Sequence, residues 1–400
     1  MEAHGPHPRR SGNLTHASDL SLHIPQQLKY AGARNQMGGK LTGKAQTTAF
    51  VLLAWITVGG PTFAQAPPPA SASVPGWEDV ASWDSVHPII TRNIVYANVP
   101  RPGNPSANPN PGTPGGIAAS VLDAPPAAPG TMNLHLDVLQ MPSPKPTPVV
   151  IQLHGGGWIR GDRPSGYGTF RAFLAAGMSV VTVQYRNAKD APAPAAIQDV
   201  RCAMAWVRAN AAKYNFDPSR VVTYGESAGG HLALMAGYAP PSFNPRGCGD
   251  QPKVVAVLDF LGPTNLAEGL TEHGSSDFTH QWIGMDVPSP PYPATSAPDG
   301  SKPSVNWPLP DEKTLARARE MSPMTYIRPG LPATFIVYGD SDHTVDPTQD
   351  TQLKKALDAA GVPNGVDVVV GRGHGGFSKE ENDRSKLLCL EFLKSRGILE

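Results

Sequence analysis

Short apolar runs alternate along this chain with longer stretches in which apolar residues recur every three or four positions. Short runs bounded by glycine, proline or polar residues are typical of β-strands, and the wider spacing is typical of amphipathic helices. The pattern predicts strands at residues 149–153, 179–184, 221–224, 254–260, 334–338 and 366–370. It predicts helices at residues 170–176, 197–211, 231–237, 352–360 and 379–395. Such alternation predicts an α/β fold, with a mostly parallel central sheet and helices on both of its faces.

Two further strands are predicted ahead of this alternation, at residues 93–99 and 133–141, where apolar residues occupy alternate positions. The stretch between them, residues 100–130, is dense in proline, glycine and asparagine. We therefore expect two edge strands whose hairpin connection makes a long irregular excursion.

Residues 262–332 do not fit the alternation of strands and helices. They contain proline-rich turns, Trp282, Trp307 and one helix-like piece at residues 312–320. An insertion of this length between consecutive strands is typical of a lid or a pocket wall. A structural flap without substrate contact is the alternative.

The N-terminal part is predicted to be a leader, residues 1–66, with an apolar core at residues 49–59. Lys40 and Lys44 precede this core, and Ala64-Gln65-Ala66 follows it. This order is that of a secretory signal peptide, and the core is too short to span a bilayer as a mature helix. We expect cleavage after Ala66 and export to the periplasm or the medium, without a stable membrane span in the mature protein. A buried core helix is the alternative.

The remaining chain divides into a spacer rich in proline, alanine and serine, residues 67–86, and a globular domain, residues 87–400, that holds the predicted strands and helices. Met37 would be a more ordinary start for a signal peptide than Met1.

Composition narrows the classes of partner. The chain has 33 Lys and Arg and 33 Asp and Glu, so no charge excess favours nucleic acid or an anionic membrane surface.

Three cysteines, Cys202, Cys248 and Cys389, would permit one disulfide in an exported protein. We favour Cys202 with Cys248, because these two occupy segments that flank the helix at 231–237. Three unpaired thiols are the alternative.

The sequence Gly225-Glu226-Ser227-Ala228-Gly229 stands between a predicted strand and a predicted helix. This is the G-x-S-x-G pattern of a nucleophile elbow, in which small residues allow the sharp turn that exposes the serine hydroxyl. A serine needs an imidazole to accept its proton, and the imidazole needs a carboxylate to orient it. We therefore assign Ser227 as a candidate nucleophile and look for its partners after later strands.

Two loops after later strands carry suitable partners. Asp342 follows the strand at 334–338, and His374 stands in a glycine-rich loop after the strand at 366–370. The order Ser, Asp, His is the one expected for this elbow. His374 is the candidate general base and acid, and Asp342 is the candidate orienting acid. Asp340 and Asp346 compete with Asp342, and His343 is interpreted as a bystander.

A glycine-rich loop, His154 to Trp158, follows the strand at 149–153. Its backbone N–H groups can face the oxygen that becomes negative during acyl transfer. Gly156 and Gly157 are the candidate donors, completed by the N–H of Ala228, and His154 is expected to support the loop. The loop lacks the spacing of phosphate-binding motifs.

Other residues suggest no metal or cofactor. The cysteines lack paired short spacing, and no H-E-x-x-H motif occurs in the sequence, so neither a metal nor a cofactor is expected. Asp199, in the predicted helix before the elbow, is interpreted as a solvated or loop-anchoring carboxylate.

Taken together, the stretches His154–Trp158, Gly225–Leu232, Gly339–Val345 and Gly373–Gly375 resemble the α/β-hydrolase superfamily, in the lipase and esterase branch with an H-G-G-G loop. Within it, the chain is most similar to bacterial carbohydrate-esterase-like proteins, including feruloyl and acetylxylan esterases, and to arylformamidase-like proteins. The resemblance implies a serine carboxylesterase acting on small-molecule or carbohydrate-linked esters, with acetyl and feruloyl groups as candidates. An amidase of the arylformamidase kind or a small peptidase is one alternative, and a noncatalytic binding module is another.

Overall fold

A computed structural model describes residues 88–100, 128–164, 167–271, 277–284 and 310–400. All of them belong to one compact unit within residues 71–400. The predicted leader, the spacer, most of the 100–130 excursion and Trp307 lie outside the described residues. No helix in the described ranges is both long and apolar enough to cross a membrane.

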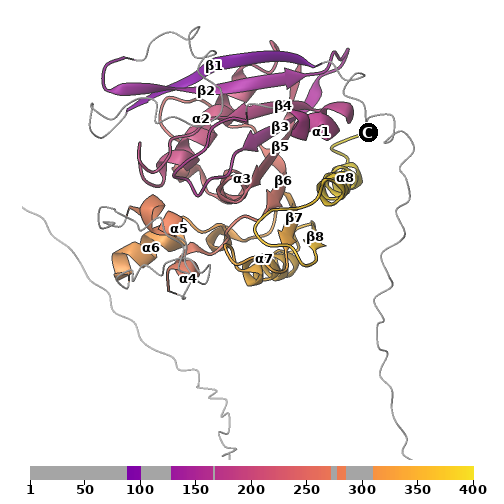
Figure 1. Ribbon diagram of the computed structural model, residues 1–400. Helices are drawn as coiled ribbons and strands as arrows, with labels where there is room; N and C mark the ends of the chain where they lie inside the picture. The colour runs from indigo at the N-terminus through magenta and orange to yellow at the C-terminus, as the bar shows by residue number, and fades with distance from the viewer. Residues whose placement is uncertain (1–87, 101–127, 165–166, 272–276, 285–309) are drawn as a thin grey trace, which may run out of the picture. The chain divides into compact units, whose positions relative to one another are not determined.

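The described residues form an eight-stranded sheet with the strand order β1-β2-β4-β3-β5-β6-β7-β8 (Figure 1). The strands are β1 Ile89–Pro100, β2 Thr131–Gln140, β3 Thr147–Leu153, β4 Ser179–Val183, β5 Phe216–Glu226, β6 Val254–Phe260, β7 Ala333–Gly339 and β8 Asn364–Val369. Strand β2 pairs antiparallel with β1 and with β4, and every other pairing in the sheet is parallel. The predicted, mostly parallel sheet is therefore confirmed. Of the two strands expected at its edge, β1 lies there, whereas β2 is not an edge strand because it pairs with β4 on its other side.

Helices cover both faces of the sheet. They are α1 Arg171–Ala175, α2 Ala195–Ala209, α3 Ala228–Tyr238, α4 Leu266–Thr271, α5 Asp277–Ile283, α6 Glu312–Glu320, α7 Pro347–Ala359 and α8 Lys379–Ser395. Side chains of α2, α3 and α7 belong to one buried cluster, and side chains of α1 and α8 belong to a second cluster. In β3, Val149 and Ile151 point into the first cluster and Val150 into the second, because successive strand residues face opposite sides.

The insertion at 262–332 is more helical than predicted. It contains α4 and α5 in addition to α6, so the prediction of a single helix was wrong. Helices of six and seven residues span two turns or less, which leaves too few positions to show a helical period in the sequence. Packing stabilises them instead, because Leu266 and Trp282 are almost completely buried.

A disulfide joins Cys202 of α2 to Cys248 in the loop that follows α3, which is the pairing favoured from the sequence. Cys389 of α8 is a free, buried thiol. The alternative of three unpaired cysteines is therefore wrong.

Candidate active site

Ser227 stands in the sharp turn between β5 and α3. Its backbone has φ 56° and ψ −123°, a conformation that non-glycine residues rarely adopt and that a surrounding structure must enforce. The turn has no room for larger neighbours. A Cβ at Gly225 would lie 2.2 Å from the carbonyl oxygen of Gly229, and one at Gly229 would lie 2.1 Å from that of Leu153. The two glycines of the motif are therefore required by close backbone contact with each other and with β3.

The hydroxyl of Ser227 begins a continuous line of hydrogen bonds. Its Oγ lies 2.8 Å from Nε2 of His374, and Nδ1 of His374 lies 2.7 Å from Oδ2 of Asp342. The other carboxylate oxygen of Asp342 accepts the backbone N–H groups of Thr344 and Val345, at 2.7 and 3.1 Å. These bonds fix the carboxylate, which orients the imidazole. Such a line can transfer a proton from a hydroxyl to an imidazole and stabilise the resulting charge.

The structure distinguishes among the candidate acids. Asp340 accepts the backbone N–H of Gly371 at 2.6 Å, on the exposed side of the loop. Asp346 is the N-cap of α7 and accepts the N–H of Thr348 at 2.8 Å. Of the three candidates, Asp342 is the one that the fold brings to His374.

The glycine-rich loop after β3 passes beside the serine. Gly157 and Ala228 line the same cavity as Ser227, whereas Gly156 is not among the residues of the cavity wall. The carbonyl oxygen of Gly156 instead accepts the N–H groups of Ile159 and Arg160, each at 3.2 Å, and closes a turn. The structure therefore places two of the three predicted backbone donors next to the nucleophile.

His154 has the contacts of a residue that supports this loop. Its ring stacks on Tyr185, with the ring centroids 4.0 Å apart, and the Tyr185 hydroxyl donates to the His154 carbonyl oxygen at 2.7 Å. The Nδ1 atom lies 2.8 Å from the carbonyl oxygen of Gly155. Burial lowers the pKa of His154, so the ring is favoured in its neutral form.

Asp199 is buried and anchors a loop. It accepts the backbone N–H of Arg186 at 2.9 Å and the guanidinium Nη2 of the same residue at 2.7 Å. The loop-anchoring interpretation is thus confirmed, and the solvated one is wrong.

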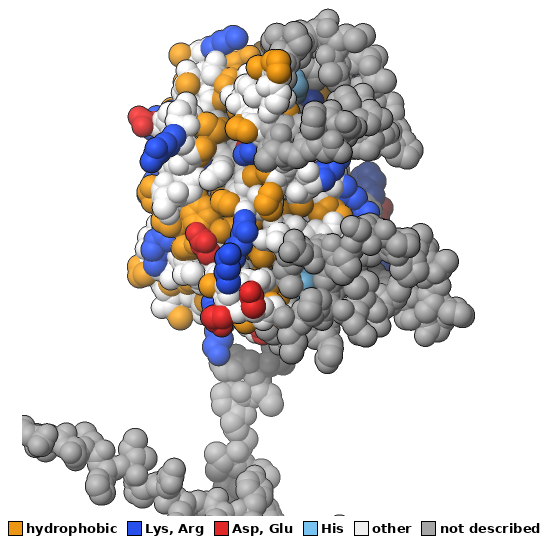
Figure 2. All heavy atoms as spheres, turned by 90° about the vertical axis from the view of Figure 1, so that its left-hand side faces the viewer, with side chains coloured by type: hydrophobic (Ala, Val, Ile, Leu, Met, Phe, Trp, Pro, Cys, Tyr) orange, Lys and Arg blue, Asp and Glu red, His pale blue; other side chains and the backbone are white. Residues whose placement is uncertain are grey.

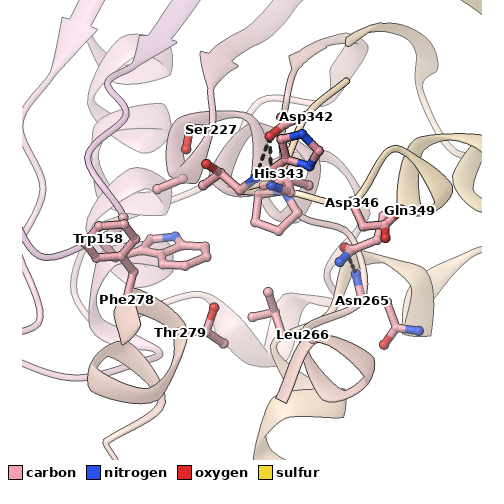
Figure 3. Close-up of a pocket in the computed structure, with 16 residues that line it drawn as sticks. Trp158, Ser227, Asn265, Leu266, Phe278, Thr279, Asp342, His343, Asp346 and Gln349 are labelled. Carbon is pink, nitrogen blue, oxygen red and sulfur yellow. Dashed lines mark hydrogen bonds between the residues drawn. The ribbon is translucent and has the colours of Figure 1, made fainter. Parts of the chain in front are cut away.

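A cavity of about 260 Å³ opens beside Ser227 (Figure 3). Trp158 and Phe278 lie together at one end, and Asn265 and Gln349 lie at the other. Its wall is formed by Gly157, Trp158, Ser227, Ala228, Pro263, Asn265, Leu266, Gly269, Phe278, Thr279, Asp342, His343, Thr344, Val345, Asp346 and Gln349. The insertion thus contributes to the pocket wall through α4 and α5, and His343 lies on the wall as well.

An aromatic cluster holds the part of the cavity wall that contains Trp158. Trp158 stacks on Trp282 of α5, with ring centroids 4.6 Å apart, and both rings meet the His231 ring edge to face. Nε2 of His231 lies 2.7 Å from the carbonyl oxygen of Met321. Burial of the ring lowers the pKa of His231 to about 4. The cluster therefore joins the glycine-rich loop, the elbow helix α3 and the insertion.

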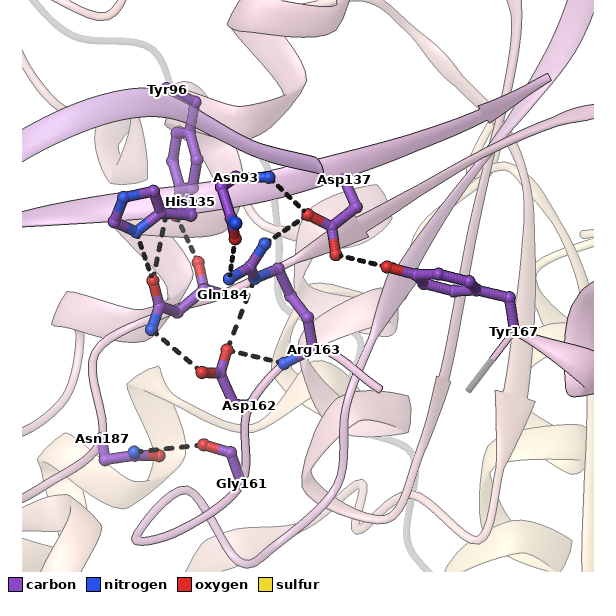
Figure 4. A network of polar contacts seen from close by, with 10 residues as sticks. All are labelled: Asn93, Tyr96, His135, Asp137, Gly161, Asp162, Arg163, Tyr167, Gln184 and Asn187. Carbon is purple, nitrogen blue, oxygen red and sulfur yellow. Dashed lines mark hydrogen bonds and ion pairs between the residues drawn. The ribbon is translucent and has the colours of Figure 1, made fainter. Parts of the chain in front are cut away.

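A buried polar network holds the segment that continues from the glycine-rich loop to Arg163 (Figure 4). The guanidinium of Arg163 pairs with Asp137 of β2, and their side chains are 8% and 5% exposed. Asp137 also accepts the hydroxyl of Tyr167 at 3.0 Å and the backbone N–H of Asn93 at 2.8 Å. The edge hairpin β1–β2 thus anchors the loop. No sequence motif indicates this pairing, because its members are distant in the chain.

Another buried acid lies beside the elbow. Asp259 is the last residue but one of β6 and lies against Gly230 and Gly262, where a Cβ on either glycine would lie 2.3 Å from its Oδ1. Burial raises the pKa of Asp259 well above its usual range, and neither of its carboxyl oxygens has a hydrogen-bond partner among the described residues. Asp259 is therefore favoured in its protonated form.

The parallel sheet, the turn that carries Ser227 and the two side chains at the ends of β7 and β8 define this chain as an α/β hydrolase. The profile of the BD-FAE family matches residues 136–357, more than half of the 400 residues. The chain belongs to the BD-FAE family, and its resemblance to the esterase branch of the superfamily is confirmed.

Two curated relatives come from Mycobacterium tuberculosis. Esterase LipQ is 28% identical over 288 residues, which cover 70% of this chain and 63% of LipQ. Carboxylesterase NlhH is 40% identical over 123 residues, which cover 30% of this chain and 36% of NlhH. The chain thus spans less than two thirds of the length of either relative.

A solved structure, a truncated form of a carbohydrate esterase from gut microbiota, shares the fold. It aligns with a TM-score of 0.54 and 22% sequence identity, covering 78% of this chain and 99% of that one.

Proposed function

We propose that this protein is a serine carboxylesterase that works through an acyl-enzyme. The observation that carries the proposal is the line of two hydrogen bonds, 2.8 and 2.7 Å long, from Ser227 through His374 to Asp342. Ser227 Oγ attacks the ester carbonyl carbon while Nε2 of His374 takes its proton. The carbon–oxygen bond to the alcohol then breaks, and Nε2 returns that proton to the departing alkoxide oxygen. A water molecule, deprotonated by the same Nε2, attacks the acyl-enzyme, and the acid leaves as Ser227 regains its proton.

The negative oxygen of each tetrahedral intermediate needs donors that are already in place. We propose the backbone N–H groups of Gly157 and Ala228 for this role, because both residues line the cavity beside Ser227. Gly156 shapes the turn that presents Gly157. The conformation of Gly157, with φ 62°, is one that glycine adopts without strain.

We propose small-molecule or carbohydrate-linked esters as substrates, with acetyl and feruloyl esters as the first to test. Both named relatives are esterases, which supports an ester over an amide. The cavity combines aromatic rings with the amide groups of Asn265 and Gln349, so it suits a substrate with both apolar and polar parts. Basic and acidic side chains are interspersed on the face shown in Figure 2, which supports the proposal that nucleic acid is not a partner.

The decisive experiment compares the wild type with Ser227→Ala in p-nitrophenyl acetate hydrolysis. We expect kcat to fall by about 10⁴- to 10⁶-fold, because the nucleophile is removed. Ser395→Ala is the matched control, since this exposed hydroxyl at the end of α8 bonds only to near neighbours in the chain, the Phe392 carbonyl oxygen and the Arg396 side chain. A fluorophosphonate probe should label the wild type and the control but not Ser227→Ala. Unchanged turnover in Ser227→Ala would refute the mechanism.

We propose further that the protein is exported. The predicted signal peptide suggests this, and the Cys202–Cys248 disulfide supports it, because such bonds persist mainly in oxidising compartments. Mass spectrometry of the protein from cell fractions should find a mature N-terminus at Pro67 outside the cytoplasm. A cytoplasmic protein that keeps the leader would contradict the proposal.

A further inference from the structure

The cavity beside Ser227 is placed asymmetrically about the reacting centre. Ser227, Gly157 and Ala228 line it, but His374 is not part of its wall. In ester hydrolysis the departing oxygen must come within hydrogen-bond reach of the imidazole that protonates it. The alcohol part of the substrate therefore has to lie on the His374 side of Ser227, where the imidazole side chain is 21% exposed.

We infer that the cavity receives the acyl part of the ester, and that Phe278 is a specificity-determining residue that limits the length of the acyl group. This inference rests on the proposed esterase function. It assigns the enclosed side of the site to the acyl group and the open side to the alcohol, so a large alcohol such as a sugar can extend into solvent.

Phe278 is held by contacts with the loop that follows β3. It packs so closely on the glycine-rich loop that a Cβ at Gly157 would lie 2.5 Å from its Cγ. The guanidinium of Arg160 lies over the Phe278 ring, with its Cζ atom 5.4 Å from the ring centroid. One turn further along α5, Trp282 stacks on Trp158 and ties the helix to the same loop. The ring is therefore a fixed wall at the end of the cavity nearest Trp158, as Figure 3 shows.

The volume of the cavity predicts which lengths of acyl group it can hold. Its volume of about 260 Å³ lies just below the range of roughly 300–1,000 Å³ that is typical of sites for drug-sized ligands. Short acyl groups fit, and each further methylene that finds apolar contact gains up to about fourfold in binding. An acyl chain that reaches Phe278 gains nothing more, because the ring packs closely against Gly157 and cannot move aside in that direction.

The test is an acyl series from two to eight carbons on one constant leaving group, p-nitrophenol. Phe278→Ala should move the maximum of kcat/KM to longer acyl groups, with a gain of about tenfold or more for the longest, mainly through KM. Phe278→Leu should shift the maximum less, and Phe278→Trp should narrow the preference to acetyl. Leu315→Ala is the control, because it truncates an apolar side chain of the same insertion outside this cavity.

A second series keeps acetyl constant and varies the alcohol. Its ranking should be the same in the wild type and in all Phe278 variants. An unchanged acyl profile, or a change in alcohol ranking instead, would overturn the inference while fluorophosphonate labelling of Ser227 left the esterase proposal standing. Absence of both labelling and turnover in the folded wild type would instead defeat the proposed function. If Phe278→Ala does not fold, the Leu and Trp variants still test the inference in opposite directions.

Discussion

His231 offers a prediction whose magnitude follows from the structure. Its ring is completely buried, with Trp158 and Trp282 packed edge to face against it, and Nε2 lies 2.7 Å from the carbonyl oxygen of Met321. Nδ1 has no hydrogen-bond partner among the described residues, so a proton added there would carry charge into an apolar site. Burial accordingly lowers the pKa of His231 to about 4, from an ordinary value of 6.5.

The lowered pKa makes folding stability depend on pH. Because the unfolded chain binds the proton more tightly, the contribution of neutral His231 is fully present above pH 6.5 and is lost as the pH falls towards 4. A shift of this size corresponds to about 3 kcal/mol between pH 7.5 and 4.0. Such a loss is a large fraction of the stability of an ordinary domain.

The assay is urea unfolding of the wild type and His231→Gln across this pH range. Glutamine can donate an amide N–H to the Met321 carbonyl oxygen but does not titrate. Other ionisable groups contribute alike to both proteins, so the difference between the two curves isolates His231. We expect that difference to shrink by about 3 kcal/mol as the pH falls from 7.5 to 4.0. If the free energies of unfolding of the two proteins changed in parallel with pH, the reasoning would be refuted.

Two more predictions concern the glycine-rich loop. Asp137→Ala leaves the Arg163 guanidinium buried without its carboxylate, so the free energy of unfolding measured by urea titration should fall by about 3 kcal/mol. The value of kcat should fall as well, because the loop becomes less firmly held. Asp383→Ala, which removes an exposed partner of Lys379, should change little, and equal effects of the two variants would contradict the anchoring role. Gly157→Ala should lower kcat for p-nitrophenyl acetate by about 10²- to 10³-fold, because the added Cβ collides with Phe278 and displaces a proposed donor. Gly168→Ala has open space and should retain activity; a fully active Gly157→Ala would exclude Gly157 as a donor.

The sequence by itself determined the features that depend on neighbouring residues. Strands β3 to β8 were visible as short apolar runs, and helices α2, α7 and α8 as longer stretches with recurring apolar residues. Helix α3 was expected because a nucleophile elbow leads from a strand into a helix. The elbow was visible because a close backbone turn requires glycines on both sides of Ser227. Asp342 and His374 could be proposed as partners of Ser227 because each follows a predicted strand, and parallel strands end at the same edge of a sheet.

The tertiary structure decided what depends on distant residues meeting. Asp340, Asp342 and Asp346 look alike in one loop. Only folding shows that Asp340 accepts the N–H of Gly371 and Asp346 that of Thr348, while Asp342 reaches His374. The short helices α4 and α5 form because Leu266 and Trp282 are buried, not because their sequences favour a helix. The Asp137–Arg163 pair and the Phe278 wall likewise arise from packing between segments far apart in the chain. Long-range contacts of this kind produce no repeating pattern in the sequence. Local backbone geometry does, because it restricts which residue types can be neighbours in the chain.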